Sequence, residues 1–292
     1  MNKEPVAIIG AGPAGIAASV QLTRCGIEPY VFEKNVIGGL LRNANFIENY
    51  PGFPNGISGV QLVKLLDRHL RKNHIRVRFE EVLDLVYQNK KFILSTTKNQ
   101  ISVKTVIIAS GTEPNVLFRP AIPRKLHNRV YYDAYAMHSI KNKSIAIIGG
   151  GDAAFDYAIG LGHKNHVIII NRSPKPKCLP VLWNRATSDR NIGYRCDVVK
   201  EIVDMNGRIL LYLVGEDIAL QVNYLLVAIG RKPDTGFLSN SLRKKINELR
   251  RKKRLFLIGD VRNGDFRQTA IAVGDGIKAA MEIYGSHCQD RT

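Results

Sequence analysis

The sequence contains little cysteine and no long hydrophobic run. Its four cysteines, Cys25, Cys178, Cys196 and Cys288, lie far apart, with neither a C-x-x-C pair nor a metal-ligand spacing. We interpret them as structural thiols and expect no bound metal and no redox dithiol. Apolar runs such as Val106–Ala109 are far shorter than the ~18 residues that a membrane span needs. The first one, Val6–Ile9, is too short for a signal peptide, so we expect a soluble, cytoplasmic protein without membrane partners.

Acidic residues are also scarce, with 25 Asp and Glu against 43 Lys and Arg, which gives a formal net charge of +18. A hydrophobic content of 45% and a charged content of 23% are ordinary globular usage, which excludes disorder, collagen and coiled coil. The 292 residues suit two domains, at about 150 residues each. The positive charge is densest in residues 243–254, a basic run that contains a single acid, Glu248. This run is either a solvated face or a contact for an acidic partner or nucleic acid. With no aromatic residue in it, we expect no specific nucleic-acid binding.

A glycine-rich turn follows the first apolar run. Val6–Ile9 reads as a strand, Gly10-Ala-Gly-Pro-Ala-Gly15 as a turn, Ile16–Cys25 as a helix and Tyr30–Glu33 as a second strand. Small residues in such a turn let the backbone approach a pyrophosphate at the helix N-terminus, and an acid in the position of Glu33 accepts a ribose hydroxyl. The pattern predicts a dinucleotide-binding unit. The alternative for Glu33 is a solvated charge at a strand end.

The same pattern returns in the middle of the chain. Ser144–Ile148 is followed by Gly149-Gly-Gly151-Asp-Ala-Ala154, an apolar helix and the strand Val167–Ile170. At the offset of Glu33 this copy carries Arg172, with Ser173, Lys175 and Lys177 after it. An arginine there accommodates a 2′-phosphate, so we expect this unit to prefer NADPH to NADH. The alternative is that these are loop charges of a basic protein.

Two similar segments mark where the chain passes between the units. Thr105–Pro114 and Tyr224–Pro233 each read as a strand, a glycine and a proline. We therefore expect residues 116–230 to form a domain inserted in one made of residues 1–115 and 231–292. Phe92–Ser95 and Arg208–Val214 are expected to be short strands beside the main sheets. The predicted fold is α/β, with two Rossmann-like, three-layer ββα nucleotide-binding domains.

The C-terminal region adds a further strand and helix. Leu255–Ile258 reads as a buried strand that leads to Gly259-Asp260, and ligands of such sheets bind at the carboxyl edge. Asp260 is thus a ligand-contact candidate, with a turn acid as the alternative. A helix is expected over Ile271–Tyr284, after Arg267-Gln-Thr-Ala270. Its first N–H groups are suited to an electron-rich ring carbonyl.

Together these motifs resemble the flavoprotein disulfide reductase superfamily and, in detail, the low-molecular-weight thioredoxin reductases. The resemblance covers nearly the whole chain and includes the two glycine turns, Gly38-Gly39, Glu48-Asn-Tyr-Pro-Gly52, Ile57-Ser-Gly59, Lys141-Asn-Lys143, Gly259-Asp260, Arg267-Gln268 and Gly274-Asp-Gly276. It implies that the first unit binds FAD without a covalent bond and the inserted unit binds NADPH. It also implies a homodimer and a rotation of the NADPH domain about hinges near residues 112–116 and 230–234.

The resemblance also implies which residues contact each cofactor. Those for FAD are Gly10, Gly12, Pro13, Ala14, Gly15, Glu33, Lys34, Gly39, Leu40, Leu41, Asn49, Val82, Ala109, Ser110, Gly111, Gly259, Asp260, Arg267, Gln268, Thr269 and Ala270. Those for NADPH are Gly149, Gly151, Asp152, Ala153, Ala154, Arg172, Ser173, Lys177 and Gly230.

The chain departs from the thioredoxin reductase pattern at the redox center. Where those enzymes carry Cys-Ala-Thr-Cys, this sequence has Tyr132-Asp-Ala-Tyr135. Thiol exchange needs a thiolate that attacks sulfur, so we expect no direct thioredoxin reduction unless Cys178 or Cys288 substitutes. The tyrosines either pack beside the flavin or have a redox role. Asn171-Arg172-Ser173 also replaces the usual His-Arg-Arg, and the segment Leu238–Arg254 is shorter than usual.

Three functional hypotheses remain. The first is an oxidoreductase in which hydride passes from NADPH to FAD and the electrons then pass to a non-dithiol acceptor. Ferredoxin or flavodoxin suits the basic surface, although relatives that use them carry a longer C-terminal segment; a quinone, oxygen or a small disulfide are the other acceptors. The second is a carrier-fed flavoprotein that no longer uses NAD(P)H. The third is a non-catalytic, flavin-bound sensor or interaction protein.

Overall fold

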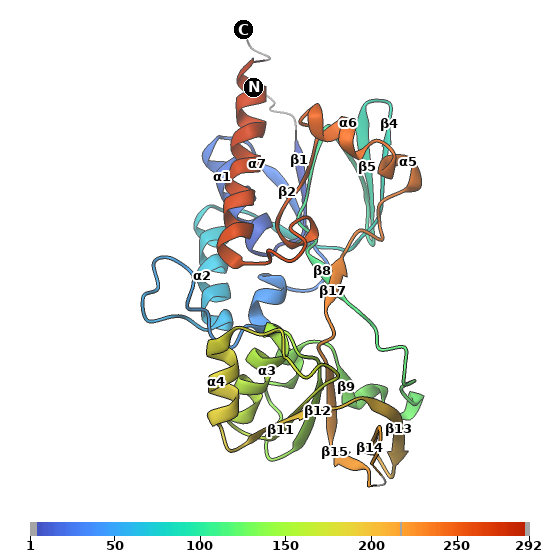
Figure 1. Cartoon of the computed structure of the whole chain (residues 1–292). Helices are drawn as coiled ribbons and strands as arrows, with labels where there is room; N and C mark the ends of the chain where they lie inside the picture. Colours follow the sequence, from blue (N-terminus) through green and yellow to red (C-terminus); the bar gives the residue numbers. More distant parts are fainter. Residues whose placement is uncertain (1–4, 217, 290–292) are drawn as a thin grey trace. The chain divides into compact units, whose positions relative to one another are not determined.

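The computed structural model describes residues 5–216 and 218–289, which divide into two compact units (Figure 1). Unit 1 comprises the chain up to Arg42, Ile47–Glu113 and the chain from Pro233. Unit 2 comprises Asn43–Phe46 and Pro114–Lys232. Its main segment begins and ends two residues outside the inserted domain expected from the sequence, and the short segment Asn43–Phe46 was not expected in it.

Unit 1 is built on a parallel sheet in the order β18-β7-β1-β2-β3. These strands are Leu255–Leu257, Thr105–Ile108, Val6–Ile9, Pro29–Glu33 and Val77–Phe79. All four residues of β1 are buried, as a strand covered on both faces requires. Val6 and Ile8 pack toward helices α1 (Pro13–Arg24) and α7 (Thr269–Gln289). Ala7 and Ile9 pack toward the antiparallel strands on the other face.

The second face of this sheet is covered by three antiparallel strands, β4 (Val82–Gln88), β5 (Lys91–Thr96) and β6 (Gln100–Val103). The other face carries α1 and α7, which lie side by side in Figure 1. They approach so closely that a Cβ on Gly276 of α7 would overlap the carbonyl oxygen of Ala14 in α1. A layer of helices, a parallel sheet and an antiparallel sheet therefore form the three layers of unit 1.

Unit 2 repeats this architecture. Its parallel sheet has the order β12-β11-β10-β16-β9, from the strands Ile192–Cys196, His166–Asn171, Ser144–Ile148, Tyr224–Val227 and Val130–Tyr131. One face packs on α3 (Asp152–Gly162) and α4 (Pro180–Ser188). The other packs on the antiparallel strands β13 (Val199–Met205), β14 (Arg208–Leu213) and β15 (Leu220–Val222). The predicted α/β fold with two Rossmann-like units is confirmed.

The chain passes between the units at two short strands, β8 (Thr112–Pro114) and β17 (Arg231–Pro233), which pair with each other. The remaining elements are α2 (Gly59–Lys72), α5 (Asn240–Arg243), α6 (Ile246–Arg251) and the 3-10 turns η1 (Gly39–Asn43), η2 (Arg124–Arg129), η3 (Ala134–Met137) and η4 (Gly259–Val261). Across residues 5–216 and 218–289, none of the helices is long and apolar enough to span a membrane. The same residues contain no group of three or more His, Cys, Asp or Glu side chains placed to hold a metal ion.

Candidate functional site

The first glycine turn connects β1 to α1, and its glycines have different reasons to be glycine. Gly10 has φ of 106°, and a Cβ there would overlap the carbonyl oxygen of Ala109. A Cβ on Gly15 would overlap the carbonyl oxygen of Gly10. Gly12 has ordinary extended geometry with φ of −76°, and a Cβ on it would meet no protein atom within 4 Å. The fold therefore requires Gly10 and Gly15, whereas at Gly12 it leaves the backbone open to a ligand.

Glu33 lies beside this turn, at the carboxyl end of β2. Its side chain is 8% exposed, and both carboxylate oxygens accept backbone hydrogen bonds. Oε2 accepts from the N–H of Ala11 at 2.8 Å, and Oε1 accepts from the N–H of Asn35 at 2.9 Å. The alternative of a solvated strand-end charge is wrong, because the carboxylate is buried and fixed on the glycine turn.

A pocket of about 290 Å³ opens next to Glu33. Its lining includes the predicted residues Gly10, Glu33, Lys34, Val82 and Ser110, together with Glu80, Glu81, Glu113 and Asp234, which the sequence did not single out. Lys34 Nζ pairs with Asp234 Oδ2 at 2.7 Å, and the Ser110 hydroxyl donates to the Asp234 carbonyl at 2.6 Å. Burial acts to lower the pKa of Lys34, but the hydrogen bond and charge of Asp234, together with the charges of Glu81 and Glu33, outweigh it, and the pKa is raised. Lys34 is therefore a fixed cation at this pocket.

The C-terminal part of unit 1 packs against the first glycine turn. Gly259 has φ of 69°, and a Cβ there would lie 2.9 Å from Cβ of Ala14. Asp275 Oδ2 accepts from the N–H of Gly259 at 3.0 Å and from Asn263 Nδ2 at 2.8 Å. Asp275 thus holds the turn that carries Asp260, a role that sequence reasoning missed although the motif Gly274-Asp-Gly276 was noted.

Two more residues that were predicted to contact FAD, Asn49 and Gln268, lie together in unit 1. Asn49 Nδ2 donates to Gln268 Oε1 at 2.9 Å, across 219 residues of sequence. Gln268 directly precedes α7, whose first residues are Thr269 and Ala270. Gly39, Leu40 and Leu41 lie in η1, and the N–H of Gly38 donates to the carbonyl of Ala11 at 2.8 Å. The first turn is contacted from four distant segments, at Glu33, Gly38, Ala109 and Gly259. Two of the residues predicted to contact FAD, Leu41 and Ala109, have side chains that are buried in the protein.

The second glycine turn, between β10 and α3, repeats the first. Gly149 has φ of 150°, and a Cβ there would overlap the carbonyl oxygen of Ala228. A Cβ on Gly150 would overlap the side chain of Asn171. Gly151 has φ of −97°, and a Cβ on it would meet no protein atom within 4 Å. Gly151 therefore corresponds to Gly12, because in each turn it is the glycine at which protein packing would tolerate a Cβ.

A basic loop lies against this second turn. The N–H of Lys177 donates to the carbonyl of Gly150 at 2.7 Å, and Asp152 Oδ1 accepts from the N–H of Leu179 at 2.8 Å. Arg172, Lys175 and Lys177 are exposed, while Ser173 is half-buried. Of the other predicted residues, Ala154 is fully buried in the core behind the turn, and Gly230 lies at the crossover with φ of 98°. The loop therefore carries three exposed cations, and the backbone of one of them, Lys177, lies against the glycine turn.

Tyr132 and Tyr135 belong to unit 2. Tyr132 packs against its core, and the Tyr135 ring stacks on His138 with centroids 4.9 Å apart. The N–H of Tyr135 donates to Asn43 Oδ1 at 2.9 Å. Within the described residues none of the four cysteines forms a disulfide, and burial raises the pKa of the Cys178 thiol, which disfavours its thiolate.

Comparison with known proteins agrees with this geometry. The family model described as pyridine nucleotide-disulphide oxidoreductase matches residues 4–276. The thioredoxin reductase of Buchnera aphidicola is 26% identical over 309 residues, which cover 95% of each chain. The crystal structure of Lactococcus lactis thioredoxin reductase (FR conformation) superposes with a TM-score of 0.84 at 28% identity, covering 97% of this chain and 98% of that one. That of T. acidophilum thioredoxin reductase has a TM-score of 0.83 at 27% identity, with coverage of 98% and 100%.

Proposed function

This chain belongs to the pyridine nucleotide-disulphide oxidoreductase family, and from that membership we propose an FAD-dependent oxidoreductase that takes hydride from NADPH and passes electrons to a non-dithiol acceptor. The observation that best supports this proposal is that Gly12 and Gly151 are glycines although a Cβ at either position would meet no protein atom within 4 Å. Each lies at the start of a helix, where backbone N–H groups favour a phosphate.

The residues of unit 1 fit FAD. Gly12 leaves room for a pyrophosphate, and the fixed Glu33 carboxylate retains lone pairs that can accept a ribose hydroxyl. The neighbouring pocket of about 290 Å³ suits part of such a ligand. When bound, the flavin would supply the hydride and electron chemistry that no side chain performs.

The residues of unit 2 fit NADPH better than NADH. Gly151 leaves the same room for a pyrophosphate, and Arg172 stands where an acid would otherwise accept the ribose 2′-hydroxyl. A guanidinium binds a phosphate through two parallel N–H groups, so Arg172 is suited to a 2′-phosphate. Lys177 adds a second cation on the same loop.

The proposal of a non-dithiol acceptor rests on the residue types at positions 132–135. Tyrosine supplies no sulfur nucleophile, so a disulfide cannot be reduced there by thiol exchange. The raised pKa of Cys178 makes that thiol a poor substitute. A net charge of +18 favours an acidic carrier, and ferredoxin or flavodoxin is therefore the proposed acceptor.

The test is steady-state oxidation of NADPH with a panel of acceptors. Purified FAD-loaded protein would be assayed with ferredoxin, flavodoxin, a quinone and oxygen, and with thioredoxin, the substrate that the relatives' names indicate. We expect turnover with an acidic carrier that falls steeply as salt is added, and none with thioredoxin. Rapid reduction of thioredoxin disulfide that survives replacement of Cys178 and Cys288 by serine would refute the proposal.

A further inference from the structure

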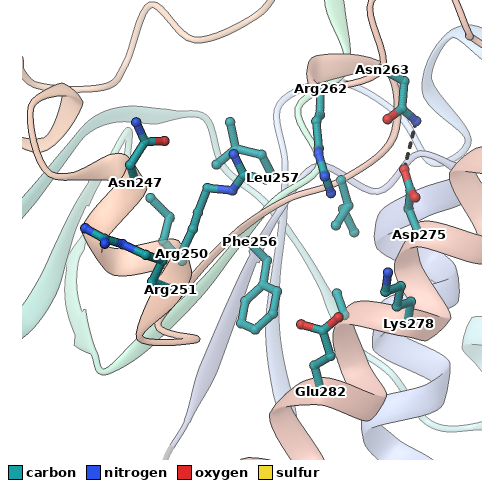
Figure 2. Close-up of a pocket in the computed structure, with 13 residues that line it drawn as sticks. Asn247, Arg250, Arg251, Phe256, Leu257, Arg262, Asn263, Asp275, Lys278 and Glu282 are labelled. Carbon is teal, nitrogen blue, oxygen red and sulfur yellow. Dashed lines mark hydrogen bonds between the residues drawn. The ribbon is translucent and has the colours of Figure 1, made fainter.

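A groove in unit 1 lies between α6, β18 and α7, and its cavity has a volume of about 880 Å³ (Figure 2). It is lined by residues of α6, by Leu255–Ile258, by the turn after η4 and by α7. None of these lining residues is among those assigned above to either cofactor. Small-molecule sites typically have volumes of ~300–1,000 Å³, so the groove is large enough for a small organic ligand.

The floor of the groove is closed and apolar. Leu255, Phe256 and Ile258 are only 1%, 9% and 3% exposed, and Leu257 is half-buried. The floor therefore offers little backbone for hydrogen bonding, and a ligand would be held by the side chains of the walls. Charges beside a buried apolar surface are screened less than charges in bulk water, so this floor strengthens the attraction between the walls and an ion of opposite sign.

Three cations on the walls of the groove lack an acidic partner. Arg250 belongs to α6, Arg262 to the turn after η4 and Lys278 to α7, and Figure 2 shows the two arginines on opposite sides of Leu257. All three are exposed, and within the described residues none makes an ion pair or side-chain hydrogen bond. A fourth cation, Arg251, also lines the groove. Positive charge from three separate segments thus converges on one cavity.

The two carboxylates of the groove leave this positive charge in place. Asp275 Oδ2 already accepts from the N–H of Gly259 at 3.0 Å and from Asn263 Nδ2 at 2.8 Å. Glu282 follows Lys278 by four residues in α7, but these two side chains, both in the described part of the chain, form no ion pair. Like charges that share a cavity repel each other, so a bound anion would relieve this repulsion.

We propose that this groove binds a small molecule that carries two or more adjacent phosphate groups. The guanidinium groups of Arg250 and Arg262 donate to phosphate oxygens from two walls, and the ammonium group of Lys278 donates from the third. A chain of phosphates has enough oxygens for donors on separate walls, whereas one carboxylate has only two. The proposal gives part of the basic run a binding role and does not depend on the redox function proposed above.

A single-stranded nucleic acid fits the groove less well than a small polyphosphate. Binding of a single strand relies on exposed aromatic rings on which the bases stack. The only aromatic residue in the lining, Phe256, is buried in the floor.

The test is calorimetric titration of the full-length protein with inorganic tripolyphosphate at low, constant ionic strength. The variant Arg250→Gln/Lys278→Gln removes a donor from two walls and should weaken binding by about tenfold or more. The matched variant Lys244→Gln/Lys253→Gln removes the same charge from the neighbouring basic run, outside the groove, and should weaken binding less than about twofold. Unchanged urea midpoints show that both variants are folded.

A second matched variant separates the groove from the basic loop of unit 2. Arg172→Gln/Lys177→Gln removes two cations from that loop and should retain the binding of tripolyphosphate that the groove variant loses. Adenosine triphosphate, titrated alongside, identifies the source of the phosphates: tighter binding than tripolyphosphate supports a nucleotide, and equal binding supports an inorganic polyphosphate. Binding lost only in the loop variant, equal loss in all three variants, equal affinity for citrate, or no binding of tripolyphosphate by the parent would each overturn the proposal.

Discussion

At the scale of single residues, Gly10 and Gly12 separate what the fold requires from what a ligand requires. Gly12→Ala introduces a methyl group that meets no protein atom, so we expect a loss of unfolding free energy of at most about 1 kcal/mol, the cost of alanine at a helix N-cap. The same methyl group lies where a pyrophosphate would approach, so the variant should lose its flavin on dialysis. The ratio of flavin to protein absorbance measures that loss.

Gly10→Ala is the matched control. It forces a side chain into φ of 106° and onto the Ala109 carbonyl, which we expect to cost roughly 3 kcal/mol or more in urea unfolding of the apoprotein. Full flavin retention by Gly12→Ala would show that the first glycine turn does not hold the pyrophosphate.

Arg172 is the residue on which the proposed preference for NADPH depends. Removing a hydrogen bond to a charged group costs about 1.5–3 kcal/mol, so Arg172→Ala should raise KM for NADPH roughly 10- to 100-fold. The KM for NADH should change little, because NADH has no 2′-phosphate. Measurement of both constants on one preparation provides the control, and equal increases would eliminate the 2′-phosphate assignment.

Asp156 in α3 gives a prediction about pH. Burial raises its pKa from 3.8 to about 6, and its carboxylate accepts from the N–H of Asn45 at 2.8 Å. Between these pH values the native carboxyl holds a proton that the unfolded chain releases. The free energy of unfolding should therefore fall as the pH rises from about 4 to about 6, by at most about 3 kcal/mol, and this contribution should stay constant above that.

Asp156→Asn keeps an oxygen that accepts from Asn45 and cannot ionise. The variant should show a weaker pH dependence between pH 4 and 6 and should be more stable than the parent at pH 7.5 in urea unfolding. A parent and variant of equal stability at pH 7.5 would contradict the raised pKa.

At the scale of elements, the sequence predicted those with a strong local pattern. Strands β1 and β10, fully or mostly buried and followed by glycine turns, have the expected bounds, and helix α1 begins only three residues before the expected start. The helices of the basic run were missed. Their signal, the spacing of Leu242, Ile246 and Leu249, was obscured by the lysines and arginines between them.

This missed helix α6 can be tested directly. Leu249 is fully buried in the core beneath the antiparallel strands, so Leu249→Ala should lower the free energy of unfolding by about 2–4 kcal/mol. Lys252→Ala removes an exposed pair with Glu248 and should shift the urea midpoint little. A small effect of Leu249→Ala would show that the basic run is a solvated segment without an anchor.

At the scale of the whole molecule, the chain uses one architecture twice, with a different charge beside each glycine turn. The sequence predicted the two glycine turns because each is formed by a short, contiguous motif. It did not predict that Asp275 would hold the turn of Gly259, or that α6, β18 and α7 would enclose a groove. Such features arise from tertiary packing between segments without a shared local signal.

The central claim is that this molecule carries electrons from NADPH to FAD. Anaerobic stopped-flow mixing of the FAD-loaded protein with NADPH, and separately with NADH, tests it most directly, with the visible flavin absorption band as the readout. We predict rapid bleaching by NADPH and much slower bleaching by NADH. A stoichiometrically bound flavin that neither nucleotide bleaches would contradict the claim, because electrons would then enter from another donor or not at all.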